Sequence, residues 1–170
     1  MISPAFALTM ARYNHWQNRS LYAAANALTN DARLADRGAF FGSIHGTLAH
    51  VLWADQVWMH RFAATAPVSV DGKQGRGPGY GDWTRLSAER ESFDAIILDW
   101  AAGLTNDWLA ADFTWSNLDG TRTTTRPAWR LVAHMFNHQT HHRGQAHAML
   151  TSAGAVPDDT DLFLLPDQAA

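Results

Sequence analysis

The most constraining feature of this sequence is a long apolar helical stripe with histidines inside it. Between Pro127 and Gly154 apolar residues recur at helical spacing, and proline and glycine favour a helix start and a helix end. On a helical wheel, His138 and His142 lie one turn apart in the middle of that stripe. Because a buried imidazole needs a polar partner, whatever packs on the stripe must supply one.

Three further stretches have helical periodicity, and we predict helices at residues 4–29, 38–64 and 83–103. The second is apolar on two faces, so we expect other elements to cover it on both sides. With the helix at 127–152, these stretches predict an all-α protein. The expected architecture is a four-helix bundle that forms a single domain over residues 1–170.

The segments between these helices have other patterns. Residues 66–82 are rich in glycine and predict a long connection after the second helix, either a linker or a lid over a site. In residues 113–125, Asp119-Gly120 separates two runs that carry Thr, Trp and Phe, which predicts a short β-hairpin before the last helix. In the tail, 156–170, we expect the apolar patch at 162–165 to pack on the bundle without long regular structure.

The composition excludes several classes of function. The chain has no cysteine, so it has no disulfide, cysteine nucleophile or thiolate metal ligand. Its 13 basic residues are balanced by 16 acidic ones without a basic cluster, which argues against a nucleic-acid partner. No apolar run reaches the roughly 18 residues of a membrane span, and no signal peptide is evident, so we expect a cytoplasmic protein. Eight tryptophans suggest large contacts and favour a homodimer.

His138 and His142 have the spacing of a metal-binding pair. Residues four apart project from one helix face, and their imidazole nitrogens can reach a common ion at about 2.0–2.1 Å. A third ligand must come from another helix. His50 is the best candidate because small residues share its face, and His15 is the other contender. The alternative is a set of core histidines that are satisfied by one another, by asparagines of the first helix or by water.

The other histidines lie away from this point on the wheel. His45 and His60 are about 140° and 80° from His50. Three more occupy flanking or surface positions of the last helix: His134, His141 and His147. Asp55 is also about 140° from His50, which favours an ion pair or a capping role over direct metal binding.

Three motifs extend this pattern, at residues 13–18, 43–50 and 136–145. The last reads Phe-Asn-His-Gln-Thr-His-His-Arg-Gly-Gln and is the most specific. Together the motifs resemble the DinB/YfiT-like family of metal-dependent proteins, over nearly the whole chain. The resemblance implies a four-helix bundle, commonly dimeric, in which one histidine of the second helix and two of the last hold a metal ion. By motif, these are His50, His138 and His142.

A site of three neutral imidazoles leaves at least one coordination position open, as catalytic metal sites do. An ion there, zinc or nickel by expectation, can lower the pKa of water or bind a substrate thiol as thiolate. Relatives in the wider family are transferases and isomerases that use low-molecular-weight thiols. The resemblance therefore implies thiol transfer or metal-assisted hydrolysis on a small molecule. A non-catalytic metal-binding or stress-related protein, and a bundle without physiological metal, remain alternatives.

Four further residues have possible roles near such a site. Tyr13 and Asn14 can bond a ligand or orient an imidazole, or they can simply pack polar groups at a helix seam. Trp53 lies about 60° from His50 and can wall the pocket or belong to the core. Arg143 can bind a substrate carboxylate or make a structural ion pair.

Overall fold

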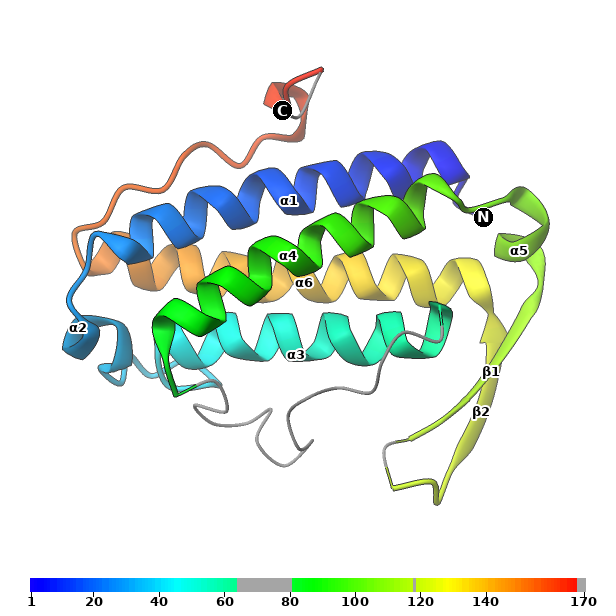
Figure 1. Ribbon diagram of the computed structural model, residues 1–170, viewed down its shortest axis with the longest axis horizontal. Coiled ribbons are helices and arrows are strands. Elements are labelled where there is room, and N and C mark those ends of the chain that lie inside the picture. Colours follow the sequence, from blue (N-terminus) through cyan, green and yellow to red (C-terminus); the bar gives the residue numbers. More distant parts are fainter. Residues whose placement is uncertain (64–80, 118, 168–170) are drawn as a thin grey trace.

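The computed structural model describes residues 1–63, 81–117 and 119–167, and its four long helices lie side by side as a bundle (Figure 1). These helices are α1 (Pro4–Asn26), α3 (Ile44–Ala63), α4 (Trp83–Ala102) and α6 (Ala128–Ser152). α1 packs against α4 and α6, and α3 packs against the same two helices. In Figure 1, α1 and α6 run in one direction while α3 and α4 run in the other. The prediction of an all-α four-helix bundle is therefore confirmed.

Local capping explains why the helices begin and end where they do. The Ser3 hydroxyl accepts a hydrogen bond from the backbone N–H of Phe6, and Pro4 takes the first helical position of α1. Asp82 caps α4 in the same way. Beyond α6, Gly154 adopts a φ of 83°, a conformation in which glycine avoids the strain of other residues.

The prediction of a helix over 38–64 is wrong at its start, because α3 begins only at Ile44. Gly38 and Gly42 adopt φ values of 71° and 73°, which are left-handed and incompatible with a right-handed helix. The segment between them forms a turn that an isolated β-bridge closes. Phe41, which the predicted helix includes, therefore lies on this turn and not on a helix.

Two short helices were not predicted, α2 (Asn30–Leu34) and α5 (Asn106–Ala110). Each is capped by a threonine, Thr29 and Thr105, whose hydroxyl accepts a backbone hydrogen bond. They lie at opposite ends of the bundle (Figure 1). At five residues each, they are too short to produce a periodic apolar pattern, and the capping threonines are the only sequence signal for them.

The predicted β-hairpin is present and extends away from the bundle (Figure 1). Strands β1 (Asp112–Ser116) and β2 (Thr123–Pro127) pair antiparallel, with Thr114 opposite Thr125. The hydroxyls of this pair are 2.7 Å apart, which ties the two strands on their exposed face. Gly120 takes a φ of 69° in the loop, as the predicted turn requires.

The segment that follows α6 runs along α1 (Figure 1). The backbone N–H of Asp158 donates to the Ser20 hydroxyl at 2.7 Å and so attaches the segment to that helix. The apolar patch of the tail forms the short 3-10 helix η2 (Leu162–Leu164). Phe163 is 83% exposed, so the prediction that this patch packs on the bundle is wrong.

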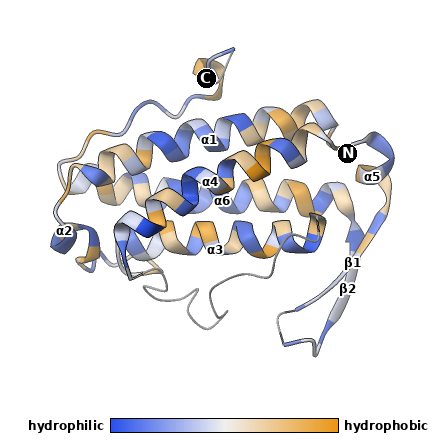
Figure 2. Cartoon of the chain, in the orientation of Figure 1, coloured by the Kyte–Doolittle hydropathy of each residue, from blue (hydrophilic) through white to orange (hydrophobic). Residues whose placement is uncertain are grey.

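The interior is layered along the bundle. An apolar cluster that includes Leu48 and Leu86 fills one end, and another that includes Met59 and Ile97 fills the other. Figure 2 shows polar residues midway along the long helices, between these ends. The candidate site and a set of buried charged side chains both lie in this middle layer.

Two predictions concern features beyond these helices. The glycine-rich connection at 66–82 lies outside the described residues except for its last two, so its role as linker or lid stays a prediction. The assignment of residues 1–170 to a single domain also stays a prediction. None of the helices in the described part of the chain combines the length and apolar character needed to cross a bilayer.

Candidate metal centre

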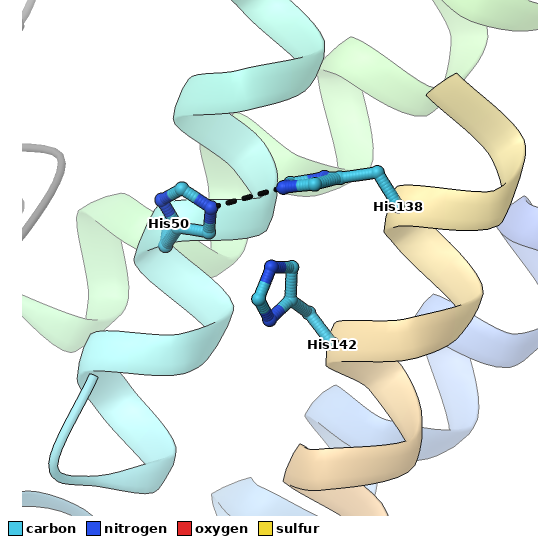
Figure 3. Close-up of side chains that lie close together, drawn as sticks. All are labelled: His50, His138 and His142. Atoms are coloured by element: carbon cyan, nitrogen blue, oxygen red, sulfur yellow. Dashed lines mark hydrogen bonds between the residues drawn. The ribbon is translucent and has the colours of Figure 1, made fainter. Parts of the chain in front are cut away.

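Three histidine side chains from two helices meet between α3 and α6 (Figure 3). His50 comes from α3, and His138 and His142 come from successive turns of α6. The Nε2 atoms of His50 and His138 are 3.1 Å apart, and one ring nitrogen from each of the three lies within 4.8 Å of the others. Nitrogens bound to one ion at 2.0–2.1 Å are roughly 3.3 Å apart at tetrahedral angles. Small side-chain rotations therefore let the three share one ion.

Phe41 covers one side of this group. Its ring stacks on the His50 imidazole with centroids 3.7 Å apart and planes 20° apart, and it meets His142 edge-on at 5.3 Å. The predicted helix over 38–64 includes Phe41, but Phe41 lies on the turn before α3, and this turn brings its ring to His50. Gly38 and Gly42, which bracket Phe41, were the signal in the sequence that could have indicated the turn.

A glycine in the first turn of α3 makes this contact possible. A β-carbon at Gly46 would lie 2.4 Å from the carbonyl oxygen of Phe41, which is far inside van der Waals contact. The backbone of the turn can therefore approach α3 only because residue 46 has no side chain. The absence of a side chain at Gly46 thus allows the Phe41 ring to pack over His50.

Gln145 fixes the protonation of one imidazole. His142 Nδ1 lies 2.8 Å from the Gln145 amide oxygen, which can only accept, so Nδ1 carries the proton. The Nε2 lone pair of His142 is then free to bind a metal ion. Our sequence reasoning missed Gln145, although its i,i+3 spacing from His142 places the two on neighbouring positions of one face.

Burial favours the neutral form of two of these imidazoles. Desolvation, followed by the nearby imidazoles of His142 and His50, lowers the pKa of His138 to about 3. Desolvation also lowers the pKa of His142. Neutral imidazole is the form that binds metal, and a set of nitrogen donors suits zinc, nickel or copper better than calcium or magnesium. The residues present therefore fit a divalent transition metal ion.

Aromatic rings surround the three histidines. The Trp53 ring lies 5.8 Å from the His50 ring, in a position to wall the site. On α6, the His134 ring lies 6.1 Å from His138, and the His141 ring lies 4.8 Å from His142. His134 and His141 are exposed, as their places on the wheel predict. They therefore flank the site on its solvent side.

The other candidate histidines lie elsewhere. His15 has Nδ1 3.6 Å from an Asp94 carboxylate oxygen and takes no part in the three-histidine group. His45 is 1% exposed and packs beside Trp83, and neither of its ring nitrogens has a hydrogen-bond partner among the described residues. The wheel correctly separated His45 from His50, but it did not indicate that His45 is buried.

A second polar cluster occupies the bundle interior. Arg90 pairs with Asp55 at 2.7 Å and with Asp94 at 2.6 Å. Asn18 donates to Asp94 at 3.0 Å, and Gln139 donates to Asp55 at 2.8 Å. The cluster thus joins all four long helices, and Asp55 makes the kind of ion pair that its wheel position favoured.

Tyr13, Asn14 and Arg143 belong to this interior and not to the histidine site. The Arg143 guanidinium donates a hydrogen bond to the Asn14 amide oxygen and lies 5.4 Å from the centre of the Tyr13 ring. Of the four additional candidates, Trp53 has a ring contact with a histidine of the site.

Comparison with known families supplies the last observation. The model of the DinB family matches residues 1–169, which is essentially the whole chain. No curated protein matches the sequence.

Proposed function

Since this chain belongs to the DinB family, we propose that it is a divalent-metal-dependent enzyme that acts on a small molecule at the three-histidine site. The observation that carries the proposal is the convergence of three imidazole side chains, with one ring nitrogen of each within 4.8 Å of the others. No fourth histidine or carboxylate joins that group among the described residues. Such a donor set leaves room for an exchangeable ligand, as catalytic sites do.

The proposed roles follow from the contacts. His50, His138 and His142 hold the ion, and zinc or nickel is the metal we propose. When bound, the ion supplies Lewis acidity and lowers the pKa of a coordinated thiol or water. Gln145 orients the His142 ring by accepting its Nδ1 proton. Phe41 and Trp53 exclude water from two sides of His50 and shape the space left for a substrate.

Proton movement requires a group that adjoins the site and reaches solvent. His141 is exposed, and its ring lies 4.8 Å from that of His142. An imidazole can accept a proton on one ring nitrogen and donate one from the other. We therefore assign His141 the role of carrying a proton between the site and solvent.

For the reaction class we propose transfer to or from a low-molecular-weight thiol, with metal-assisted hydrolysis as the second reaction. Both need an open metal position and a small substrate, and the nitrogen donor set supports both. A homodimer and a cytoplasmic location, predicted from the tryptophan content and the resemblance, are part of this proposal. A nucleic-acid partner is not, because the charge is balanced.

The test begins with metal content. Protein purified without a histidine tag or a nickel column should contain close to stoichiometric zinc or nickel by elemental analysis. Zinc, nickel and manganese forms should then be assayed against electrophilic and ester substrates, with and without small thiols. We expect turnover that depends on the metal. Absence of metal, or metal without turnover in any form, would contradict the proposal.

A non-catalytic metal-binding role is the second candidate, and the cover provided by Phe41 favours it. Cobalt-substituted protein separates the two roles, because its visible spectrum reports changes in coordination. A spectrum that responds to small thiols supports the enzyme. A spectrum that stays unchanged with thiols and with small anions supports a closed binding site.

A further inference from the structure

A cavity of about 250 Å³ lies between α1, α6 and the C-terminal segment. Its walls include the Tyr13 ring, Leu21, Arg143 and Gly144, and Thr160 of the C-terminal segment borders it. None of its lining residues belongs to the three-histidine group. The cavity is therefore a space separate from the candidate metal centre, although α6 contributes to both.

Arg143 is the permanently charged group of this cavity, whose lining also includes His147. Arg143 is only 5% exposed. Asn14 accepts one of its hydrogen bonds, and the Thr140 hydroxyl accepts another, long one at 3.4 Å. A guanidinium has five N–H donors, so most of the donors of Arg143 have no strong acceptor in these contacts. Among the described residues, no carboxylate lies within ion-pair distance of Arg143.

The buried carboxylates do not fill that role, because another arginine holds them. Asp55 and Asp94 both pair directly with Arg90. They act on Arg143 only at longer range, and burial lowers its pKa to about 10. Arg143 is still protonated at neutral pH. A buried cation with only neutral acceptors has lost hydration that those acceptors do not fully replace, and an anion that reaches it can compensate for this loss.

We propose that this cavity binds a small carboxylate, whose two oxygens pair with the guanidinium of Arg143. Planar guanidinium and carboxylate groups match in a bidentate arrangement that neutral ligands cannot reproduce. Leu21 and the Tyr13 ring offer apolar surface to the rest of the ligand. The cavity volume is smaller than the roughly 300–1,000 Å³ of typical pockets for drug-sized ligands. We therefore expect the ligand to be a carboxylic acid of only a few carbons.

The C-terminal segment borders the cavity and is tied to α1. The Tyr13 hydroxyl donates to the carbonyl oxygen of Thr160 at 2.6 Å, and the Gln17 amide donates to that of Asp159 at 2.9 Å. A ligand in the cavity therefore lies beside Thr160, and its arrival should change the surroundings of that residue. The NMR signal of the Thr160 amide can therefore report binding in the cavity.

The experiment is an NMR titration of the ¹⁵N-labelled full chain with propionate and, separately, with propionamide. We expect saturable shifts of the Gly144 and Thr160 amide signals with propionate. Propionamide has the same shape without the charge, and it should bind at least about tenfold more weakly.

Gly144→Leu provides the matched variant. A β-carbon at this position meets nothing within 4 Å, so the leucine can grow into the cavity without a clash and also favours the helix. We expect it to weaken propionate binding at least about tenfold. Ala95→Leu, at an exposed position of α4, should leave binding unchanged. If Gly144→Leu fails to fold, Ala148→Leu fills the same cavity.

Four results would overturn the proposal. The first is equal binding of propionate and propionamide. The second is propionate binding that a folded, cavity-filling variant leaves intact. The third is a set of shifts confined to residues around His138, which would place the carboxylate at the histidine site instead. Absence of any saturable shift would also overturn it, whatever the outcome of the metal assays.

Discussion

The middle of the bundle contains two polar regions, and they are built on different principles. In the interior cluster, Arg90 lies between Asp55 and Asp94, and the opposite charges complete one another. In the histidine site, His50 and His138 share a hydrogen bond, and the three ring nitrogens lie within 4.8 Å of one another with no acidic group in the set, so a cation can complete it. A polar cluster that satisfies itself supports the fold, while one that lacks a complement is suited to bind a ligand. The predictions below test this distinction.

The largest effect is expected from breaking the self-satisfied cluster. Arg90→Met leaves two buried carboxylates without their cation, and both are at most 2% exposed. We expect it to lower the free energy of unfolding by about 3–5 kcal/mol. Urea denaturation followed by circular dichroism measures this loss.

The control for that variant lies on the same helix. The Arg85 side chain is 64% exposed and has only a surface ion pair with Glu89. Arg85→Met should change stability by no more than about 0.5 kcal/mol. If Arg90→Met behaved like Arg85→Met, the cluster would not have the structural role assigned to it.

The next effect concerns the histidine site and should appear in binding more than in folding. His138→Ala removes one of the three donors, and we expect zinc affinity to fall by more than the roughly 10–100-fold seen for outer contacts of metal sites. Stabilisation by added zinc should disappear with it. His134→Ala, one turn earlier on α6, should retain both. Competition with a chromophoric chelator gives the affinities, and equal losses in the two variants would count against the site.

A smaller effect is expected at Gln145, which holds the proton of His142 Nδ1. Gln145→Leu removes the acceptor and should reduce zinc affinity by about 10-fold, the low end for such supporting contacts. Gln145→Glu keeps an acceptor and should recover most of the loss. The same chelator competition measures both, and a leucine variant with unchanged affinity would show that the ring needs no such support.

The smallest effect is expected at His45, a buried imidazole that belongs to neither region. Burial and the nearby positive charge of Arg33 lower its pKa, while Asp82 acts in the opposite direction. Below about pH 6.5 the unfolded chain then binds a proton that the folded chain does not, so stability falls as the pH falls. His45→Leu should make the free energy of unfolding less sensitive to acid between about pH 8 and pH 5. The same acid sensitivity in both proteins would refute this account.

Helical spacing paired His138 with His142 and favoured His50 over His15 as the third member, and the resemblance to the family implied the same three residues. Helices α3 and α6 are regular where they carry His50, His138 and His142, so a wheel represents each of them faithfully. Binding of metal by these residues stays a prediction. Phe41 could not be placed in this way, because two left-handed glycines interrupt the helical geometry just before α3.

The interior cluster was beyond sequence reasoning for a different reason. The wheel shows that Asp55 lies away from His50, but the partner of Asp55 is 35 positions along the chain, on α4. Periodicity describes each helix separately and does not give the rotation of one helix against another. The separation of Arg143 from the histidines depends on the same rotation.

The bare backbone at Gly46 has a consequence for how access to the histidine site can change. The carbonyl oxygen of Phe41 rests where a methyl group would otherwise sit. The size of residue 46 therefore sets how closely the turn that carries Phe41 can approach α3, and so how closely the Phe41 ring packs on His50. Replacing Gly46 by alanine would push the backbone of Phe41 away from α3. Evolution or design can therefore widen access to the histidine site without altering any side chain that touches the ion or the substrate.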